Sequence, residues 1–129
     1  MHTVFEKNSS YPIDETIKRV KSELMDKGFG VLWELNFKNK FKEKGFDYKY
    51  DYWIFEVCNP KIAIQVIETD QTAGYFLPCK VAVFDSDQGV RAGLVKPSEM
   101  IGLVSNDSTL QEHAKNVEDI LTGAIDRAL

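Results

Sequence analysis

Three consecutive residues near the middle of the chain, Cys58, Asn59 and Pro60, constrain the fold more than any other short stretch. The residues before them, "YWIFEV", are apolar and aromatic, as in a buried strand. Asparagine is a favoured helix N-cap and proline a favoured first helical residue. We therefore predict a strand that ends at Cys58 and a helix over residues 60–69, although alternating β-branched residues in that segment would also suit a strand.

Hydrophobic patterns predict the other elements of the chain. Apolar residues at helical spacing indicate helices over residues 11–28 and 108–129, and the lysine-rich piece before Gly45 favours a short helix. Alternating patterns predict strands over residues 3–9, 29–37, 47–58, 79–84 and 90–95. The resulting order, β-α-β-α-β-α-β-β-α, indicates an α+β fold.

Two finer predictions concern the ends and faces of these elements. Ser108 and Gln111 match a capping box at the start of the last helix. In the second strand, strict alternation puts five residues on one side, with Leu32 as the exception to the pattern. These five are Phe29, Val31, Trp33, Leu35 and Phe37.

Length and charge limit the class of protein. A chain of 129 residues, 43% of them hydrophobic and 28% charged, is typical of a single globular domain, which we expect over residues 1–129. The net charge of −4 disfavours a broad nucleic-acid-binding surface. The first ten residues resemble no signal peptide, and no apolar run is long enough to span a membrane. We expect a soluble, cytoplasmic protein with reduced cysteines.

The two cysteines lie close to prolines at the predicted end or start of a strand: Cys58 is two residues before Pro60, and Cys79 directly follows Pro78. A helix that begins at Pro60 would stabilise a thiolate at Cys58, because backbone N–H groups and the helix dipole favour an anion there. A reactive thiol, a disulfide and two buried, inert cysteines all fit the sequence. If the two strands are antiparallel neighbours the thiols share one edge of the sheet, whereas parallel strands would separate them by a full strand length.

Signals for other chemistry are weaker. Cys58 and Cys79 match no close-spaced zinc motif, so we predict no metal, although a site completed by Glu56 or a second subunit fits the residue types. The only histidines are His2 and His113. A lysine run with interleaved aromatic residues is typical of nucleic-acid binding, but in an acidic chain a solvated surface is favoured. The run comprises Lys38, Lys40, Lys42, Lys44 and Lys49.

The segments "GFGVLWELNF", "FKEKGFDY", "CNPKIA" and "GYFLPCKVAVFD" occur in this order. With this order and spacing, the chain resembles the domain-of-unknown-function 302 family over nearly its whole length. Members typically have asparagine after the second cysteine, where this chain has Lys80. The resemblance implies a β-α-β(4)-α arrangement, a curved, mostly antiparallel sheet similar to that of TATA-box-binding proteins, and a homodimer. It also implies that residues 60–69 are helical and that Cys58 lies near Cys79.

We expect a ligand-binding or thiol-based sensing module, with a small molecule as a further partner, and not an enzyme. A cysteine-dependent enzyme with Cys58 as nucleophile and a purely structural homodimeric scaffold are the alternatives. The sequence identifies no cofactor and no catalytic residue. The candidate site gathers six residues, Cys58, Asn59, Pro60, Pro78, Cys79 and Lys80.

Overall fold

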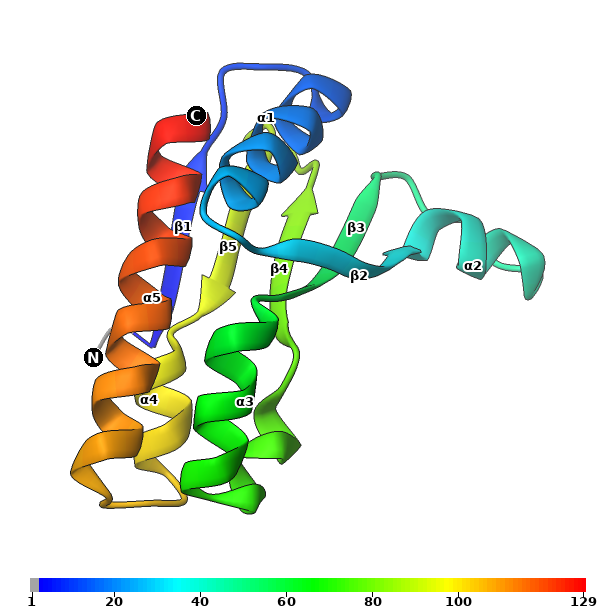
Figure 1. Ribbon diagram of the computed structural model, residues 1–129. Helices are drawn as coiled ribbons and strands as arrows, with labels where there is room; N and C mark the ends of the chain where they lie inside the picture. Colours follow the sequence, from blue (N-terminus) through cyan, green and yellow to red (C-terminus); the bar gives the residue numbers. More distant parts are fainter. Residues whose placement is uncertain (1–2) are drawn as a thin grey trace.

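A five-stranded sheet with helices packed on one face forms the framework of the computed structural model, which describes residues 3–129 (Figure 1). The strands lie in the order β1-β5-β4-β3-β2, and each neighbouring pair is antiparallel. The α+β class and the antiparallel sheet expected above are therefore confirmed. The strands are β1 (Val4–Asn8), β2 (Gly30–Asn36), β3 (Tyr52–Cys58), β4 (Cys79–Phe84) and β5 (Arg91–Val95).

The helices α1 and α5 cover one face of the sheet, whereas α2 projects beyond β2 and β3 (Figure 1). The helix predicted after Cys58 is confirmed at both ends as α3, and a short 3-10 helix, η1, follows it. None of the helices in residues 3–129 is long and apolar enough to cross a membrane. The helices are α1 (Ile13–Asp26), α2 (Phe37–Glu43), α3 (Pro60–Thr69), η1 (Gln71–Phe76), α4 (Pro97–Gly102) and α5 (Ser108–Ala128).

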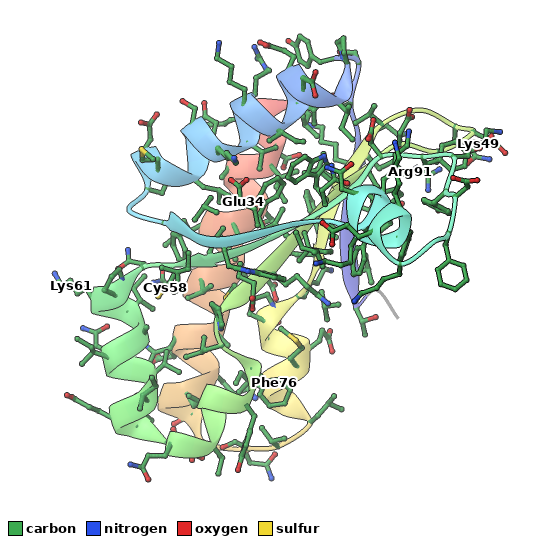
Figure 2. The ribbon with its side chains drawn as sticks, turned by 90° about the vertical axis from the view of Figure 1, so that its right-hand side faces the viewer. Glu34, Lys49, Cys58, Lys61, Phe76 and Arg91 are labelled. Atoms are coloured by element: carbon green, nitrogen blue, oxygen red, sulfur yellow. The ribbon has the colours of Figure 1, made fainter. Side chains whose placement is uncertain are left out.

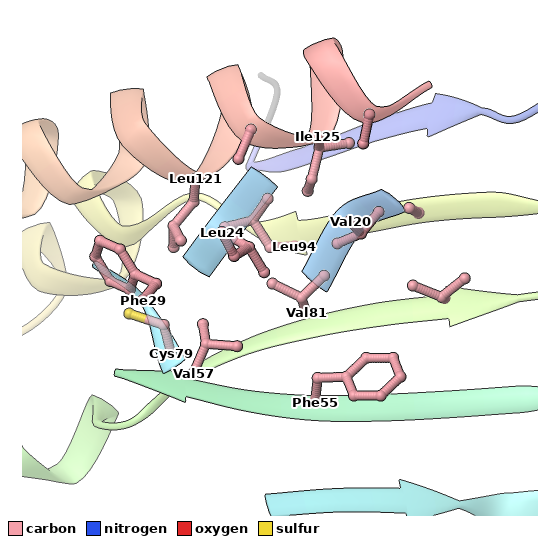
Figure 3. Close-up of a cluster of buried hydrophobic side chains, with 14 of the residues drawn as sticks. Val20, Leu24, Phe29, Phe55, Val57, Cys79, Val81, Leu94, Leu121 and Ile125 are labelled. Carbon is pink, nitrogen blue, oxygen red and sulfur yellow. The ribbon is translucent and has the colours of Figure 1, made fainter. Parts of the chain in front are cut away.

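The main core lies between the sheet and the helix pair α1 and α5 (Figure 3). Alternate residues of β3 and β4 point into it, as the period of a strand requires. Complete burial of an aliphatic or aromatic side chain contributes about 1.5–3 kcal/mol, so this layer is the main source of stability. Its most buried members are Phe55, Val57, Val81 and Val83 from the sheet, and Val20, Leu24, Leu121 and Ile125 from the helices.

A second, smaller apolar cluster continues the core beyond the end of the sheet. It joins α3, η1, α4 and the first half of α5, through Val66, Ala73, Ile101, Leu110 and Ala114. Neither η1 nor α4 is predicted from the sequence, because each is only six residues long and too short to show a helical pattern of apolar residues.

The alternation predicted for the second strand is interrupted by a β-bulge. The pairing of β2 with β3 shifts between Val31 and Trp33, so Leu32 is the extra residue, and its side chain is 63% exposed. Val31 lies opposite Val57 on the core side, whereas Trp33 lies opposite Glu56 on the other side. The prediction that all five residues share one face is therefore wrong, because one inserted residue switches the face of everything that follows it.

The start of the last helix also differs from the prediction. Asp107, not Ser108, is the N-cap of α5, and its carboxylate accepts a hydrogen bond from the backbone N–H of Leu110 at 2.9 Å. Both residue types are good N-caps, and the sequence offered them side by side. The side chain of Gln111 instead donates to the backbone oxygen of Ser105, so no capping box forms.

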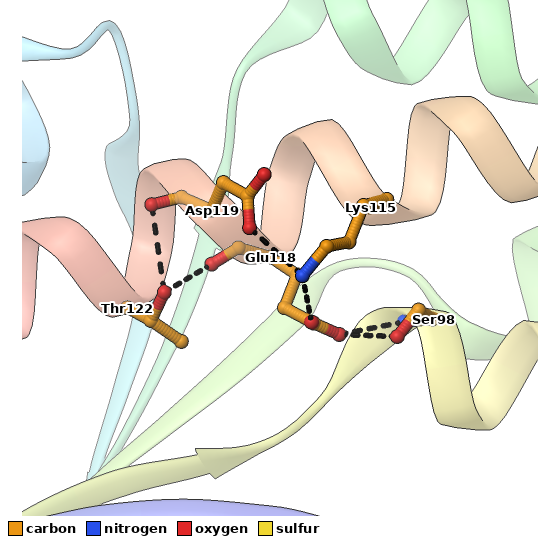
Figure 4. A network of polar contacts seen from close by, with 5 residues as sticks. All are labelled: Ser98, Lys115, Glu118, Asp119 and Thr122. Carbon is orange, nitrogen blue, oxygen red and sulfur yellow. Dashed lines mark hydrogen bonds and ion pairs between the residues drawn. The ribbon is translucent and has the colours of Figure 1, made fainter.

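A buried carboxylate ties α4 to α5 (Figure 4). Oε1 of Glu118 accepts hydrogen bonds from the backbone N–H of Ser98 at 3.1 Å and from its hydroxyl at 2.5 Å. Lys115 pairs with the other carboxylate oxygen at 3.1 Å and with Asp119 at 3.1 Å. The N-cap residue of α4, Lys96, makes no side-chain cap, so Glu118 supplies the acceptor that the first turn of α4 lacks.

Replacement of Glu118 by glutamine should lower the free energy of unfolding at neutral pH by about 1–3 kcal/mol, because the amide keeps the shape but loses the charge. Burial raises the pKa of this carboxyl, but the hydrogen bonds from Ser98 and the charge of Lys115 outweigh it and leave the pKa below its usual value. The stabilisation is therefore present above the pKa of the unfolded chain, near 4.5, and is lost as the pH falls through the lower folded-state pKa. Urea unfolding at several pH values measures this.

The matched control is Asp119→Asn, which removes the exposed partner of the same lysine and should change stability by less than about 0.5 kcal/mol. Equal losses in the two variants would contradict a specific role for Glu118.

Candidate functional site

The end of β3 and the start of α3 form one continuous junction at Cys58, Asn59 and Pro60. The side-chain oxygen of Asn59 accepts a hydrogen bond from the backbone N–H of Ile62 at 3.3 Å, and Pro60 is the first helical residue. Both roles agree with the sequence prediction. The two residues therefore have a structural task, which is to turn the chain from strand to helix directly after the cysteine.

Gly28, in the turn between α1 and β2, lies against this junction. Its φ of +83° favours glycine, and a β-carbon built there would lie 2.9 Å from the side-chain nitrogen of Asn59. The sequence identified Gly28 only as the end of a helix. Its contact with Asn59 joins segments thirty-one positions apart, and no local pattern reports such a contact.

Pairing of β3 with β4 brings the two cysteines together. Cys79 lies directly opposite Val57, the residue before Cys58, and the two strands are antiparallel. Cys58 and Cys79 line the same apolar cavity of about 30 Å³, together with residues that include Phe29, Ala63 and Leu77. The question that the sequence left open is thus answered: both thiols border one small space, and neither forms a disulfide.

The two thiols have different surroundings. Cys79 is 8% exposed and belongs to the main core, beside Phe29 and Val57 in Figure 3. Burial, and then the nearby Cys58, raise the pKa of the Cys79 thiol to about 11. Cys58 is only half-buried, at the start of α3 (Figure 2). Cys58 is therefore the more exposed residue of the pair.

A second apolar cavity, of about 40 Å³, is also lined by Cys79 and shares Val66, Leu77 and Val117 with the first. Its lining includes His113 of α5, Met100 of α4 and Phe76 of η1. His113, one of the two histidines in the sequence, therefore lines a cavity that Cys79 also lines. Each cavity has room for about one water-sized group, so neither accommodates a drug-sized ligand.

The other predicted site residues fall into two groups. Pro60 and Pro78 flank the thiols, and the bond between Leu77 and Pro78 is cis. Lys80 and Glu56 lie opposite each other in the sheet and share the face turned away from Cys79. No group of three or more metal-binding side chains occurs in residues 3–129, and His2 lies outside the described residues.

The raised pKa of Cys79 predicts a loss of stability at alkaline pH. The thiol of the unfolded chain ionises near pH 9.0, whereas the folded one ionises near pH 11, so in this window only the unfolded chain releases the proton. The stability contribution is complete below pH 9.0 and falls above it by about 1.4 kcal/mol per pH unit. Urea unfolding of the wild type and of Cys79→Ala between these pH values isolates the contribution of the Cys79 thiol, because the other ionisable groups titrate alike in the two proteins. Parallel curves would contradict the shift.

Comparisons with known proteins agree with this geometry. A family model described as "Domain of unknown function DUF302" matches residues 5–128. The crystal structure of an uncharacterized conserved DUF302 protein from Bacillus stearothermophilus is similar over 100% of both chains, with 36% sequence identity and a TM-score of 0.95. No curated protein matches the chain. Since the family model covers nearly the whole sequence and a relative of the same family shares its fold from end to end, the chain belongs to the DUF302 family.

Proposed function

We propose that the protein is a thiol-based sensing module, in which Cys58 meets the oxidant and Cys79 is its partner. The observation that carries the proposal is the shared cavity, which one half-buried and one buried cysteine border together. A sensor needs one accessible thiol and a second thiol within reach. A pair of purely structural cysteines would both be expected inside the core, as Cys79 is.

Backbone geometry supports closure of a disulfide between the two. Cys79 is paired with Val57, and Cys58 is the next residue, so the two Cα atoms are offset by one step across adjacent strands. Such an offset corresponds to roughly 6 Å, within the range that disulfides span. Cys58 is the last residue of β3, opposite Gly30 of β2, and it lines the same cavity as Cys79.

The chemistry requires an oxidant, for which we propose a hydroperoxide. The Cys58 thiolate attacks one peroxide oxygen, the O–O bond breaks, and a sulfenic acid forms while the other oxygen leaves and takes up a proton. The Cys79 sulfur then attacks the Cys58 sulfur, the S–O bond breaks, and the thiol proton leaves with the hydroxide as water. With hydrogen peroxide, two thiols and one peroxide yield one disulfide and two waters.

The surroundings of Cys58 favour sensing over enzyme catalysis. Among the described residues that line its cavity, Asn59 is the only polar side chain besides the two thiols. A nucleophilic cysteine enzyme needs a general base within hydrogen-bond reach, and this lining offers none. Burial raises the pKa of the Cys79 thiol, so this thiol is protonated at neutral pH and attacks more slowly than a thiolate would.

Titration with hydrogen peroxide tests the proposal. The wild-type protein should lose two hydrogens in its intact mass, and dithiothreitol should restore them. Cys79→Ser should stop at a sulfenic acid that dimedone traps, and Cys58→Ser should stay unmodified at the same peroxide concentration. Circular dichroism confirms that both variants fold. An unchanged wild-type mass, or equal oxidation of the two variants, would contradict the proposal.

A homodimer and a cytoplasmic location stay predictions for this chain. Native mass spectrometry at micromolar concentration should show twice the mass of the chain if the dimer forms, and a monomer mass at every concentration would exclude it.

A further inference from the structure

In residues 3–129, no helix crosses the face of the sheet opposite α1 and α5, and α2 packs only against its edge (Figure 1). Cross-strand partners share a face, and the pairs Glu56 with Lys80 and Ile54 with Ala82 place their side chains here. We call this surface the open face. Besides those four residues it carries Tyr52, Phe84 and Gly93.

Three hollows on or beside the open face share one residue, Lys80. Their volumes are about 260, 390 and 330 Å³. The largest, which we call the aromatic hollow, is within the usual range for small-molecule sites. It is lined by Phe37, Phe41, Tyr48, Tyr52, Ile54 and Lys80.

The aromatic rings that line the aromatic hollow pack against one another. Phe37 stacks on Phe41 with 5.4 Å between ring centres and meets Tyr52 edge-on at 5.9 Å. Phe41 meets Tyr48 edge-on at 5.6 Å, and Tyr52 stacks on Phe84 at 4.8 Å. Since α2 buries none of its residues, these ring contacts are its main attachment to the sheet.

Lys80 differs from the lysines around the hollow. Lys40 pairs with Glu43 at 3.0 Å and Lys49 with Asp87 at 3.5 Å. In the part of the chain that the structure describes, Lys80 has no carboxylate within 4.0 Å and donates no hydrogen bond, although Glu56 faces it across the sheet. Its ammonium group is therefore a cation without a partner at the border of an aromatic wall.

We propose that the aromatic hollow binds a planar organic anion. The acid group, a carboxylate or sulfonate, pairs with the ammonium of Lys80, and the flat apolar body lies against Phe41 and Tyr52. Aromatic walls take a flat ring by stacking, and the single cation selects an anion over a neutral molecule of the same shape. The site lies on the opposite face of β4 from Cys79, so it is independent of the thiol proposal.

Two fluorescent probes of nearly the same shape test this inference. Anilinonaphthalene sulfonate carries an acid group, and phenylnaphthylamine is its neutral counterpart. The wild type should bind the sulfonate saturably and about fivefold more tightly than the neutral probe. Lys80→Met should remove that difference while leaving the affinity for the neutral probe unchanged.

The matched control is Lys18→Met, an exposed lysine of α1 on the helix side of the sheet, which should leave both affinities as in the wild type. Phe41→Ala should weaken the binding of both probes, since it removes an aromatic ring from the lining of the hollow but leaves the charge of Lys80. Circular dichroism checks that each variant is folded, because loosened cores also bind such dyes.

Three results would overturn the inference: no saturable binding of the sulfonate, equal affinity for the two probes, or no effect of Lys80→Met. A second copy of the chain on the open face would also overturn it. In that case native mass spectrometry would show a dimer, and Lys80 would be protected from acetylation only in the dimer. The sulfonate probe would then not bind the dimer.

Discussion

The antiparallel pairing of β3 with β4 is the constraint on which the rest of the structure depends. Its register places Val57 opposite Cys79 and Glu56 opposite Lys80. The first pair points into the core, beneath α1 and α5, and the second points to the open face. A shift of one residue would exchange the two sets, burying a lysine and exposing the core valines, at a cost of several kcal/mol. The register is therefore fixed by burial as well as by backbone hydrogen bonds.

Much of the fold follows from local patterns in the sequence. The cap at Asn59 and Pro60 defines α3, and apolar spacing defines α1 and α5. Features that depend on distant partners do not follow. The bulge at Leu32 exists because β2 must match β3, and α4 is completed by Glu118 from another helix.

The candidate site likewise combines features that local sequence predicts with features that depend on distant partners. The sequence identified both cysteines and their prolines, but left open whether the thiols meet, because that depends on strand direction. It grouped Lys80 with Cys79 because they are adjacent in the chain. Consecutive residues of a strand point to opposite faces of the sheet, so Lys80 lies on the open face whereas Cys79 lies in the core. The aromatic hollow escaped prediction because its rings come from α2, the loop after it and β3, and the aromatic residues among the lysines gave no sign of where they would pack.

The alternation of Cys79 and Lys80 along β4 also has a thermodynamic consequence. One peptide bond separates Cys79, which lines the core cavities, from Lys80, which lies on the open face, so a change of the backbone at that point would reach both sides. Linkage is reciprocal: if an occupant of one face alters the ease of oxidation on the other by a given factor, oxidation alters the affinity for that occupant by the same factor.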